Sequence, residues 1–545
     1  ATFYFQTPKN KTRVANSNES IYLESKISNW DTANKWFIIK NRKNNRLTPL
    51  STGNWIQFHL NEDAINCINY ETIYSVYPLI SSSDPRSLSI FTSSELGRSR
   101  TQNTNQEIPE NLVEIAIEIE GENDGTFDSG DKIIFYGRGP SGFDIMNSEI
   151  NWHQNVYFTN NTYWLFIPDN HDERGLRIED ALSPTSVSLT LDYGITTLHN
   201  ENDFINLEAS GTEWVGNAVN GGNSQVIITS ISKPKVGVDT EISARLRGFS
   251  SSGSQSATHN ISLTFGNPSG TQIGESEIWS GSAARIIEDQ SQSASLNDGT
   301  NLFYINNSST DTYSSPYLDY FNIKYGRELY FGDEFEFFSP TFNQDLRFNI
   351  SGTPSPSETI WNITDIKKPK NMIISSTNTI DLVANPNSIS RFILFDKNNL
   401  KEVTNLTLKS EIDFQTLRNN EIQANYIIIG PKQFQEEAVA LMQLRSPAIY
   451  ADLETIYQEF CAGNEDPMGI RSFIQWTKEY WISPEPICLL LLGDSGYDYR
   501  NITGNSTIIV PTIQVQGSRT YASDDLFATL TGNIPEIAIG RFPAR

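Results

Sequence analysis

The chain of 545 residues is long enough for roughly three or four domains of ordinary size. Its hydrophobic content of 37% and aromatic content of 11% support packed cores and exclude wholesale disorder. With 65 Asp and Glu against 40 Lys and Arg, the net charge of −25 excludes a nucleic-acid-binding protein and a protein held on an anionic bilayer by charge.

Residues 1–424 have the pattern of antiparallel β structure, because short segments alternate apolar and polar residues between clusters of Gly, Asn, Asp, Ser and Pro. The predicted strands lie at 35–41, 113–120, 132–137, 162–168, 224–231, 241–249 and 259–266. Polar joints at 97–106, 231–237 and 351–359 separate them. We predict four β-rich parts: 1–105, 106–230, a jelly-roll-like sandwich at 231–360, and a connector at 361–424.

An acidic loop lies between two of these strands, from Glu122 to Asp131. Asp124, Asp128 and Asp131 offer oxygen ligands on a glycine-containing loop, which is what calcium requires. The spacing is not that of an EF-hand, and a polar hairpin with Asx-type turns is the commoner use of such a sequence. The loop therefore predicts either a calcium site or a plain hairpin.

The predicted sandwich at 231–360 is rich in aromatic residues. Trp279 and the tyrosines fit a carbohydrate-binding face, but aromatic residues more often belong to a core or an interface. We expect the core.

Near residue 425 the pattern changes to α/β. Residues 425–430, 486–494 and 536–542 read as buried strands of a parallel sheet, and residues 431–446, 452–460 and 466–481 read as helices. Strand–helix–strand order with right-handed crossovers predicts a doubly wound layer over 425–545. In that layer Pro486–Leu492 should be an inner strand of the sheet.

The helix at 466–481 carries the clearest local signals. Asp466 is a candidate N-cap, and Pro467 suits the first helical position. Ile470, Phe473, Ile474 and Thr477 follow at helical spacing, which predicts the face that meets the core.

Gly493-Asp494-Ser495-Gly496 is also the tetrapeptide around the nucleophile of trypsin-like proteases. All five histidines lie at or before residue 259 without the matching histidine motif, and Tyr497 stands where a hydrolase elbow needs glycine. The sequence therefore argues against Ser495 as a nucleophile. Asp494 instead follows a buried parallel strand, where it could bind a metal or order the loop.

The three cysteines, Cys67, Cys461 and Cys488, are sparse and far apart, so they form neither a disulfide framework nor a zinc motif. Cys488 lies within a predicted strand, where a small buried hydrophobe is the ordinary role. No apolar segment approaches the ~20 residues of a membrane span. The chain begins ATFYFQ, so we expect that a signal peptide has been removed or that the chain was trimmed.

Five segments carry a family resemblance: NYIIIGPKQF, DLETIYQEFCAGNEDPMGIRSFIQW, PICLLLLGDSGYDYRN, YASDDLFATLTGN and PEIAIGRFPAR. In this order they resemble the first half of the catalytic domain of gingipain-type (family C25) cysteine peptidases. EGENDGTFDSGDKIIFYGRGPSGF, YLDYFNIKYGREL and IWNITDIKKPKNM resemble the β-rich leader of one branch, the sortases of the bacterial type IX secretion system. The resemblance implies antiparallel β-sandwiches followed by a caspase- or gingipain-like α/β subdomain.

The resemblance also bears on the catalytic residues. In this family the histidine and the nucleophilic cysteine follow the Ile-Gly-Arg-Phe strand, which here ends at Phe542. No residue of this chain is therefore assigned as catalytic, and the chain alone is predicted to be inactive. The family's structural calcium would fall on Asp494 and Glu536, although a shorter connection with Ile534 and Pro535 puts that site in doubt. Asp524 and Asp525 are candidates for a helix N-cap.

As a function, the resemblance implies a sortase at the extracellular face of the outer membrane. Such an enzyme removes C-terminal sorting domains from secreted cargo and helps to attach the cargo to anionic lipopolysaccharide. Since the chain has no membrane span, we expect a PorV-like β-barrel shuttle protein as its anchor. A secreted gingipain-like protease and a non-catalytic β-rich scaffold protein are the alternatives.

Overall fold

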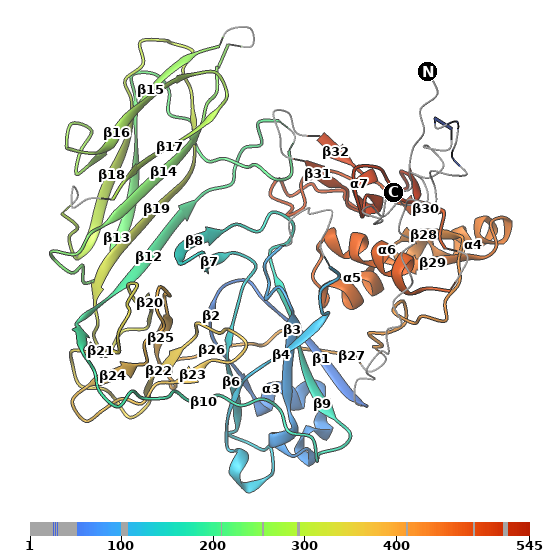
Figure 1. Ribbon diagram of the computed structural model, residues 1–545, viewed down its shortest axis with the longest axis horizontal. Coiled ribbons are helices and arrows are strands. Elements are labelled where there is room, and N and C mark those ends of the chain that lie inside the picture. The colour runs from blue at the N-terminus through green and yellow to red at the C-terminus, as the bar shows by residue number, and fades with distance from the viewer. Residues whose placement is uncertain are drawn as a thin grey trace.

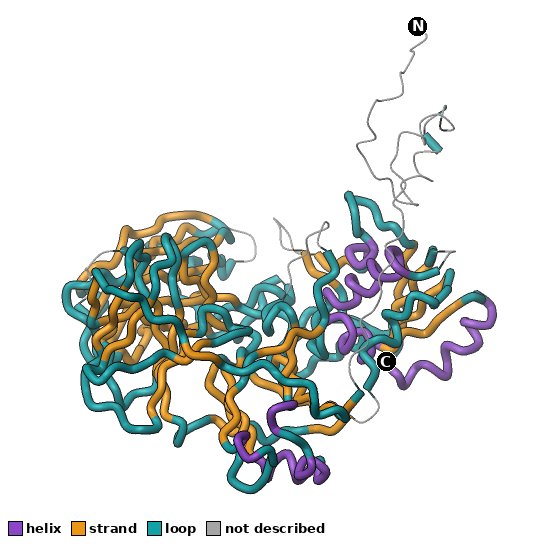
Figure 2. Tube along the Cα trace, turned by 60° about the horizontal axis from the view of Figure 1, so that its bottom comes forward, coloured by secondary structure: helices purple, strands orange, loops and turns teal. Residues whose placement is uncertain are grey.

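The computed structural model describes residues 25, 26, 28, 30, 52–99, 107–208, 210–252, 256–290, 295–409, 412–482, 485–515 and 521–545. The predicted strand at 35–41 lies outside the described residues. The fold class agrees with the prediction: antiparallel sheets make up most of the molecule, and a parallel sheet with helices lies toward the C-terminus (Figure 1). Figure 2 shows the helices gathered in that subdomain and at one end of the first β part.

The first β part is a sandwich of two sheets. One has the order β27 (Thr407–Lys409), β1 (Gly53–Leu60), β9 (Asn161–Pro168), β3 (Ser89–Ser93), β4 (Leu112–Ile115). The other has the order β26 (Lys401–Glu402), β2 (Ala64–Asn69), β6 (Lys132–Gly137), β5 (Glu118–Glu120), and α3 (Tyr70–Val76) follows β2. Apolar residues that alternate along these strands meet in one core, with Phe58 and Phe135 fully buried.

The second β part is built on a nine-stranded sheet. Its order is β10 (Glu179–Asp180), β23 (Lys370–Asn371), β22 (Glu358–Asn362), β25 (Arg391–Asp396), β20 (Phe335–Phe338), β12 (Tyr193–Glu201), β19 (Tyr317–Glu328), β14 (Glu241–Arg247), β17 (Ala284–Asp289). One end packs on a sheet of β13 (Ser224–Ile231), β18 (Gly299–Asn307), β15 (Thr258–Phe265) and β16 (Thr271–Ser280). The other end packs on β11 (Leu189–Leu191), β21 (Leu346–Asn349) and β24 (Thr379–Leu382). Trp279 lies in the core of the first of these sandwiches, as expected.

The sheets do not follow the predicted boundaries within the β-rich part. β3 and β4 lie on opposite sides of residue 105 and pair with each other. β12 pairs with β19 across residue 230, and β22 pairs with β25 across residue 360. The division into 1–105, 106–230, 231–360 and 361–424 is therefore wrong, because antiparallel strands that are distant in sequence share sheets through long connections.

The C-terminal subdomain agrees with the prediction. Its parallel sheet has the order β29 (Ala448–Asp452), β28 (Tyr426–Gly430), β30 (Cys488–Leu492), β33 (Ala538–Phe542), so β30 is an inner strand. The helices are α4 (Gln435–Leu444), α5 (Leu453–Cys461), α6 (Met468–Tyr480) and α7 (Asp525–Ala528), and β31 (Ile513–Val515) and β32 (Tyr521–Ser523) form a small ribbon.

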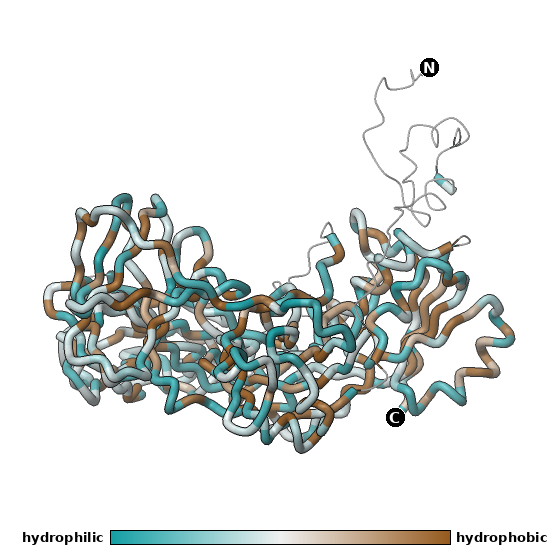
Figure 3. The backbone as a smooth tube through the Cα atoms, turned by 90° about the horizontal axis from the view of Figure 1, so that it is seen from below, coloured by the Kyte–Doolittle hydropathy of each residue, from teal (hydrophilic) through white to brown (hydrophobic). Residues whose placement is uncertain are grey.

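Helices cover both faces of this sheet. α5 and α6 pack on the fully buried face, and α4 packs on the other, where Leu490 and Leu492 are only partly buried. Figure 3 shows the hydrophobic stretches concentrated in these parallel strands. Asp466 supports the start of α6 by accepting a hydrogen bond from the Met468 amide at 2.8 Å, and all four predicted core residues of that helix are fully buried.

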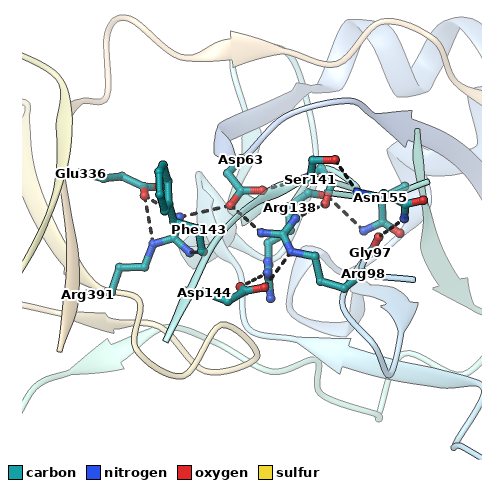
Figure 4. Close-up of polar contacts among 12 residues, drawn as sticks. Asp63, Gly97, Arg98, Arg138, Ser141, Phe143, Asp144, Asn155, Glu336 and Arg391 are labelled. Atoms are coloured by element: carbon teal, nitrogen blue, oxygen red, sulfur yellow. Dashed lines mark hydrogen bonds and ion pairs between the residues drawn. The ribbon is translucent and has the colours of Figure 1, made fainter. Parts of the chain in front are cut away.

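A buried cluster of charges joins the two β parts (Figure 4). Arg391 of β25 donates to Glu336 of β20 at 2.9 Å, to Asp63 in the turn between β1 and β2 at 3.1 Å, and to the Phe143 carbonyl oxygen at 3.0 Å. The Arg391 side chain is only 4% exposed. Burial alone would lower the pKa of Arg391, but Glu336, Tyr136 and Asp63 together raise it, so the group stays charged.

Two further arginines extend the cluster within the first β part. Arg98 pairs with Asp63 at 3.2 Å and with Asp144 at 3.0 Å, and Arg138 also pairs with Asp144. Against its burial, the pKa of Asp63 is lowered by Arg98, Arg391 and Arg138. Removing one member of such a set leaves a buried charge uncompensated, which costs far more than the intact set contributes.

Candidate functional site

The candidate site is the edge of the parallel sheet where β28, β30 and β33 end. In an open α/β sheet, ligands bind outside the carboxyl ends of the strands, because the connecting loops meet there. Here the edge is formed by Gly493 and Asp494 after β30 and by residues 543–545 after β33. The Asp494 amide donates to the Ala544 carbonyl oxygen at 2.9 Å, so the two loops lie side by side.

Arg541 of β33 organises this edge. Its guanidinium donates to the carbonyl oxygens of Gly493 at 2.9 Å, Val510 at 2.7 Å and Pro511 at 2.9 Å. It also forms a two-point ion pair with Asp524, at 2.7 and 2.8 Å. The planar guanidinium has five donors in a fixed fork, so one side chain holds three chain segments in place.

Asp494 orders the loop after β30. Its carboxylate accepts hydrogen bonds from the Ser495 amide at 2.9 Å and from Arg545 Nε at 2.7 Å. The Arg545 hydrogen bond is the largest cause of the lowered pKa of Asp494, followed by the Ser495 amide. Gly493 before it has φ +150°, and a Cβ there would lie 2.7 Å from the Ile509 side chain, so glycine is required.

The structure does not bring Asp494 and Glu536 together. Glu536 precedes β33 and accepts from the Thr531 amide at 3.1 Å and from the Thr531 hydroxyl at 2.6 Å, whereas Asp494 lies level with Ala544 at the far end of that strand. Eight residues of extended chain separate those two levels, about 26 Å at a rise of 3.3 Å per residue. Calcium ligands lie within about 2.6 Å of the ion, so this pair cannot share one calcium.

The acidic loop between β5 and β6 is closed by its own hydrogen bonds. Asp124 accepts from the Thr126 amide and hydroxyl, both at 2.9 Å, and Asp131 accepts from the Asp128 amide at 2.9 Å. Burial, with Asp128 and Asp124 nearby, raises the pKa of Asp131. Among the described residues, no three His, Cys, Asp or Glu side chains are grouped so that they could hold a metal ion. This geometry is the hairpin alternative, and calcium remains a prediction from the sequence.

The candidate nucleophiles of the C-terminal subdomain have no histidine within that subdomain. Ser495 Oγ is buried and has no hydrogen-bond partner among the described residues. Cys461 Sγ lies 3.8 Å from the Asp466 carbonyl oxygen, and Cys488 is in β30. His59, His153, His171, His199 and His259 all belong to the β-rich parts. Burial raises the pKa of Cys67 in β2, so this thiol also lacks thiolate character at neutral pH.

The second β part contacts the loop at 497–514, which borders this edge. Arg500 pairs with Asp203 at 2.7 Å, and the Gly211 amide donates to the Gln514 side chain. A Cβ on Gly211 would overlap the Tyr497 carbonyl oxygen and the Tyr499 ring, so only glycine allows this approach. These contacts could not be predicted from the sequence, since nothing in the pattern near residue 211 distinguishes it from other polar turns.

The first β part docks on the turn between α5 and α6. The Asn464 side chain accepts from the Thr162 amide at 2.7 Å and donates to Asn161 Oδ1 at 3.0 Å. Trp164 Nε1 donates to the Ala462 carbonyl oxygen at 2.7 Å. Both β parts are therefore built against the peptidase-like subdomain.

One predicted role at this edge differs from the structure, and one role was not predicted. Asp524 occupies the N-cap position of α7, but its carboxylate pairs with Arg541 and caps no amide of the helix. Arg541 lies within the Ile-Gly-Arg-Phe segment that carried the resemblance, but its role as a clamp was not predicted. A short sequence motif does not reveal which backbone oxygens a side chain reaches.

Among known protein families, residues 419–545 match the family model described as peptidase family C25. The crystal structure of dimeric latent PorU from Porphyromonas gingivalis matches with a TM-score of 0.72 at 17% sequence identity, over 91% of this chain and 48% of PorU. The chain thus spans about half the length of PorU, and the likeness covers the β-rich parts as well as the parallel sheet. The predicted resemblance is confirmed.

Other solved structures match only a smaller part of the chain. The CBM36-1 domain of a xylanase from the hindgut metagenome of Trinervitermes trinervoides has a TM-score of 0.16 at 14% identity, over 24% of this chain and 95% of its own. The CBM22-1 xylan-binding domain of Paenibacillus barcinonensis Xyn10C has a TM-score of 0.16 at 16% identity, over 28% and 97%. No curated protein matches this chain.

Proposed function

We propose that this chain is the N-terminal portion of a type IX secretion sortase, a cysteine endopeptidase that removes C-terminal sorting domains from secreted cargo. The observation that carries the proposal is the extent of the likeness to PorU, a TM-score of 0.72 over 91% of the chain. A likeness confined to residues 419–545 would suit any C25 peptidase. The shared β-rich leader favours the sortase branch over a secreted gingipain-like protease.

In this proposal the chain supplies the frame of the active site. By the resemblance, the cysteine nucleophile and the histidine base would lie C-terminal to β33, and a thioacyl intermediate would be resolved by water or by an amine of anionic lipopolysaccharide. Arg541 holds the loops at the carboxyl edge, and Asp203 and Gly211 hold the loop at 497–514 from the other side. Proximity and orientation depend on such a rigid frame.

The 545-residue chain by itself is expected to be inactive. The described cysteines and serines of the C-terminal subdomain have no histidine in that subdomain, because all five histidines belong to the β-rich parts. We expect neither hydrolysis of peptides nor reaction with thiol-directed, peptide-based inhibitors. Turnover that Ser495→Ala abolishes would overturn this expectation, because it would identify Ser495 as a nucleophile.

The proposed location is the extracellular face of the outer membrane, with a PorV-like β-barrel shuttle protein as the anchor. No helix among the described residues is long and apolar enough to cross a membrane. The β-rich parts are the proposed docking region, since they lie outside the peptidase subdomain and offer sheet edges and loops.

Affinity purification of the native protein from detergent-solubilised outer membranes tests this function. We expect a β-barrel protein and cargo with C-terminal sorting domains to co-purify, and cargo processing to stop when the gene is deleted. If the protein is free in the medium and no barrel co-purifies, the secreted protease is the better assignment. If cargo processing persists when the gene is deleted, the non-catalytic scaffold protein is the better assignment.

A further inference from the structure

The outer face of the nine-stranded sheet carries a groove. Along β19, Phe321, Ile323 and Tyr325 face the sandwich core, so the alternating residues Tyr320 and Asn322 face outward. The β7 (Gly142–Met146) and β8 (Glu149–His153) hairpin stands over this face, beside β12 in Figure 1. Two hollows of about 490 and 390 Å³ lie between the hairpin and the sheet.

The two hollows adjoin, because Trp152, Ile286 and Tyr320 line both of them. The second hollow reaches Arg500, in the loop that borders the carboxyl edge of the parallel sheet. The groove formed by the two hollows therefore extends from the sandwich to the loop beside the candidate site.

The lining of the groove is acidic. Nine Asp and Glu side chains line the two hollows against three Lys and Arg. Each of these three cations is already paired with a carboxylate of the groove: Arg245 with Asp319, Arg500 with Asp203 at 2.7 Å, and Lys324 with Glu241 at 2.9 Å. The lining thus has an excess of negative charge that its own cations do not balance.

The strand register places one of these carboxylates, Glu201 of β12, in a row with an aromatic ring. The row crosses neighbouring strands from Glu201 to Tyr320 of β19, Arg245 of β14 and Ile286 of β17. Burial, and to a smaller extent Glu201 and Glu213, raises the pKa of Asp319 to about 6, although Arg245 lowers it. A positive ligand would relieve this repulsion.

Aromatic rings of the hairpin and of β12 lie beside the same row of residues. The Trp152 ring of the hairpin stacks on His199 of β12, with centroids 3.9 Å apart, and Tyr320 lies 5.9 Å from His199. Aromatic faces beside carboxylates are the arrangement that attracts ammonium and guanidinium groups.

We propose that this groove binds an extended polypeptide segment rich in lysine and arginine, as an exosite for polypeptide substrates. The inference rests on the proposed function for the class of ligand, since a peptidase acts on polypeptides. The acidic lining of the hollows repels anionic lipopolysaccharide. Charge complementarity therefore selects a cationic ligand, and Arg500 places one end of the groove at the loop beside the candidate site.

Binding to the 545-residue chain tests the proposal without any catalysis. The probe is a fluorescein-labelled twelve-residue peptide that alternates lysine and serine, measured by fluorescence anisotropy at pH 8 and low salt. A peptide with glutamate in place of lysine reports non-specific attachment. We expect the lysine peptide to bind and the glutamate peptide not to bind.

Two matched variants locate the binding. Ile286→Lys places a tethered cation in the middle of the groove, and Ile278→Lys makes the same change in β16 of the opposite sheet; the two isoleucines are 44% and 66% exposed. We expect Ile286→Lys to weaken binding about tenfold or more, because one desolvated charge contact is worth roughly that factor. Ile278→Lys should change binding less than about twofold.

A milder pair removes charge without adding bulk. The double variant Glu288→Gln/Glu149→Gln should weaken binding about fivefold. The control double variant Glu275→Gln/Glu421→Gln makes the same change in net charge outside the groove and should not weaken binding. The proposal would be overturned if Ile286→Lys caused no loss of binding, if Ile286→Lys and Ile278→Lys caused equal losses, or if the two double Glu→Gln variants caused equal losses. Displacement of the peptide by an equal concentration of spermidine would assign the groove to a polyamine and overturn it too. Since no arm needs turnover, failure of the sortase assignment leaves these results unaffected.

Discussion

The parallel sheet of the C-terminal subdomain and the junction of the two β parts are held together by opposite means. The sheet buries a continuous apolar core in which Leu491, Phe473 and Ile474 are fully buried. The junction buries three arginines and three carboxylates, with Arg391 at its centre. Apolar packing has no direction and tolerates adjustment, whereas a buried ion cluster is stable only when every member is present.

The largest expected effect is at the junction. Arg391→Met leaves Glu336 and Asp63 without their partner, and we expect a loss of about 3–5 kcal/mol in the free energy of unfolding of the β parts. Chemical denaturation followed by tryptophan fluorescence measures it. Arg347→Met is the control: its two-point ion pair with Asp381 lies at the surface, with the arginine side chain 40% exposed, so the loss should be several-fold smaller. Equal losses in the two variants would contradict the comparison.

Next comes the apolar core. Leu491→Ala in β30 should cost about 3 kcal/mol, because it removes a fully buried side chain between the sheet and the α5–α6 layer. Leu490→Ala, on the half-buried α4 face, is the matched control and should cost roughly half as much. If Leu490→Ala costs as much as Leu491→Ala, the two faces of the sheet are not buried as the structure shows.

Glu459 is an exception to the apolar packing of the C-terminal subdomain, because it is a carboxylate buried in that core. It accepts from the Leu417 amide at 2.9 Å and from the Arg418 amide at 2.9 Å, and burial raises its pKa to about 7. The unfolded chain releases this proton near pH 4.3, so the native state binds more protons between about pH 4.3 and 7. Over that window stability should fall as the pH rises, and it should level off above pH 7.

Unfolding free energies measured across that window test Glu459. Glu459→Gln should flatten the decline, because it removes the titrating group and keeps an acceptor for the two amides. Glu454→Gln, an exposed change on the same helix, should leave the pH profile unchanged. An unaltered slope in Glu459→Gln would show that other groups cause the decline.

Calcium should give the smallest effect. The carboxylates of the acidic loop already accept hydrogen bonds within the loop, so we expect at most a weak site of the extracellular kind. At 1 mM calcium, a site with a Kd of about 1 mM adds only about 0.4 kcal/mol. Thermal unfolding with and without chelator measures this, and Asp128→Asn should remove it while Asp172→Asn keeps it. A shift of more than about 3 kcal/mol would mean that the loop rearranges into a strong site.

The parts of the fold that could be predicted depend on signals that lie within a few residues of one another. The helical spacing of Ile470, Phe473 and Ile474 correctly predicted the buried face of α6, and the apolar strand at 486–492 correctly predicted an inner position in the sheet. The division of the β-rich region was wrong, because a strand such as β12 gives no local sign that its partner is β19, more than a hundred residues away.

The candidate site shows the same limit. Its position at the carboxyl end of β30 follows from the order of strands and helices, and so does the role of Asp494 in ordering the loop. The pairing of Asp494 with Glu536 failed, because residues that flank neighbouring parallel strands can lie at opposite ends of the sheet. The Arg541 clamp was not predicted, since its partners are backbone oxygens that any residue would present.

The fold class, the start of the α/β subdomain near residue 425, its helices and a family resemblance carried by short segments could all be predicted from the sequence. These features arise from hydrophobic periodicity and from glycine, proline and capping residues, which act locally. The three-dimensional structure was needed to show which distant strands share a sheet, which charges form the cluster around Arg391, and that an acidic groove reaches the loop beside the candidate site. Those features depend on side chains brought together from separate strands, and no local pattern records that convergence.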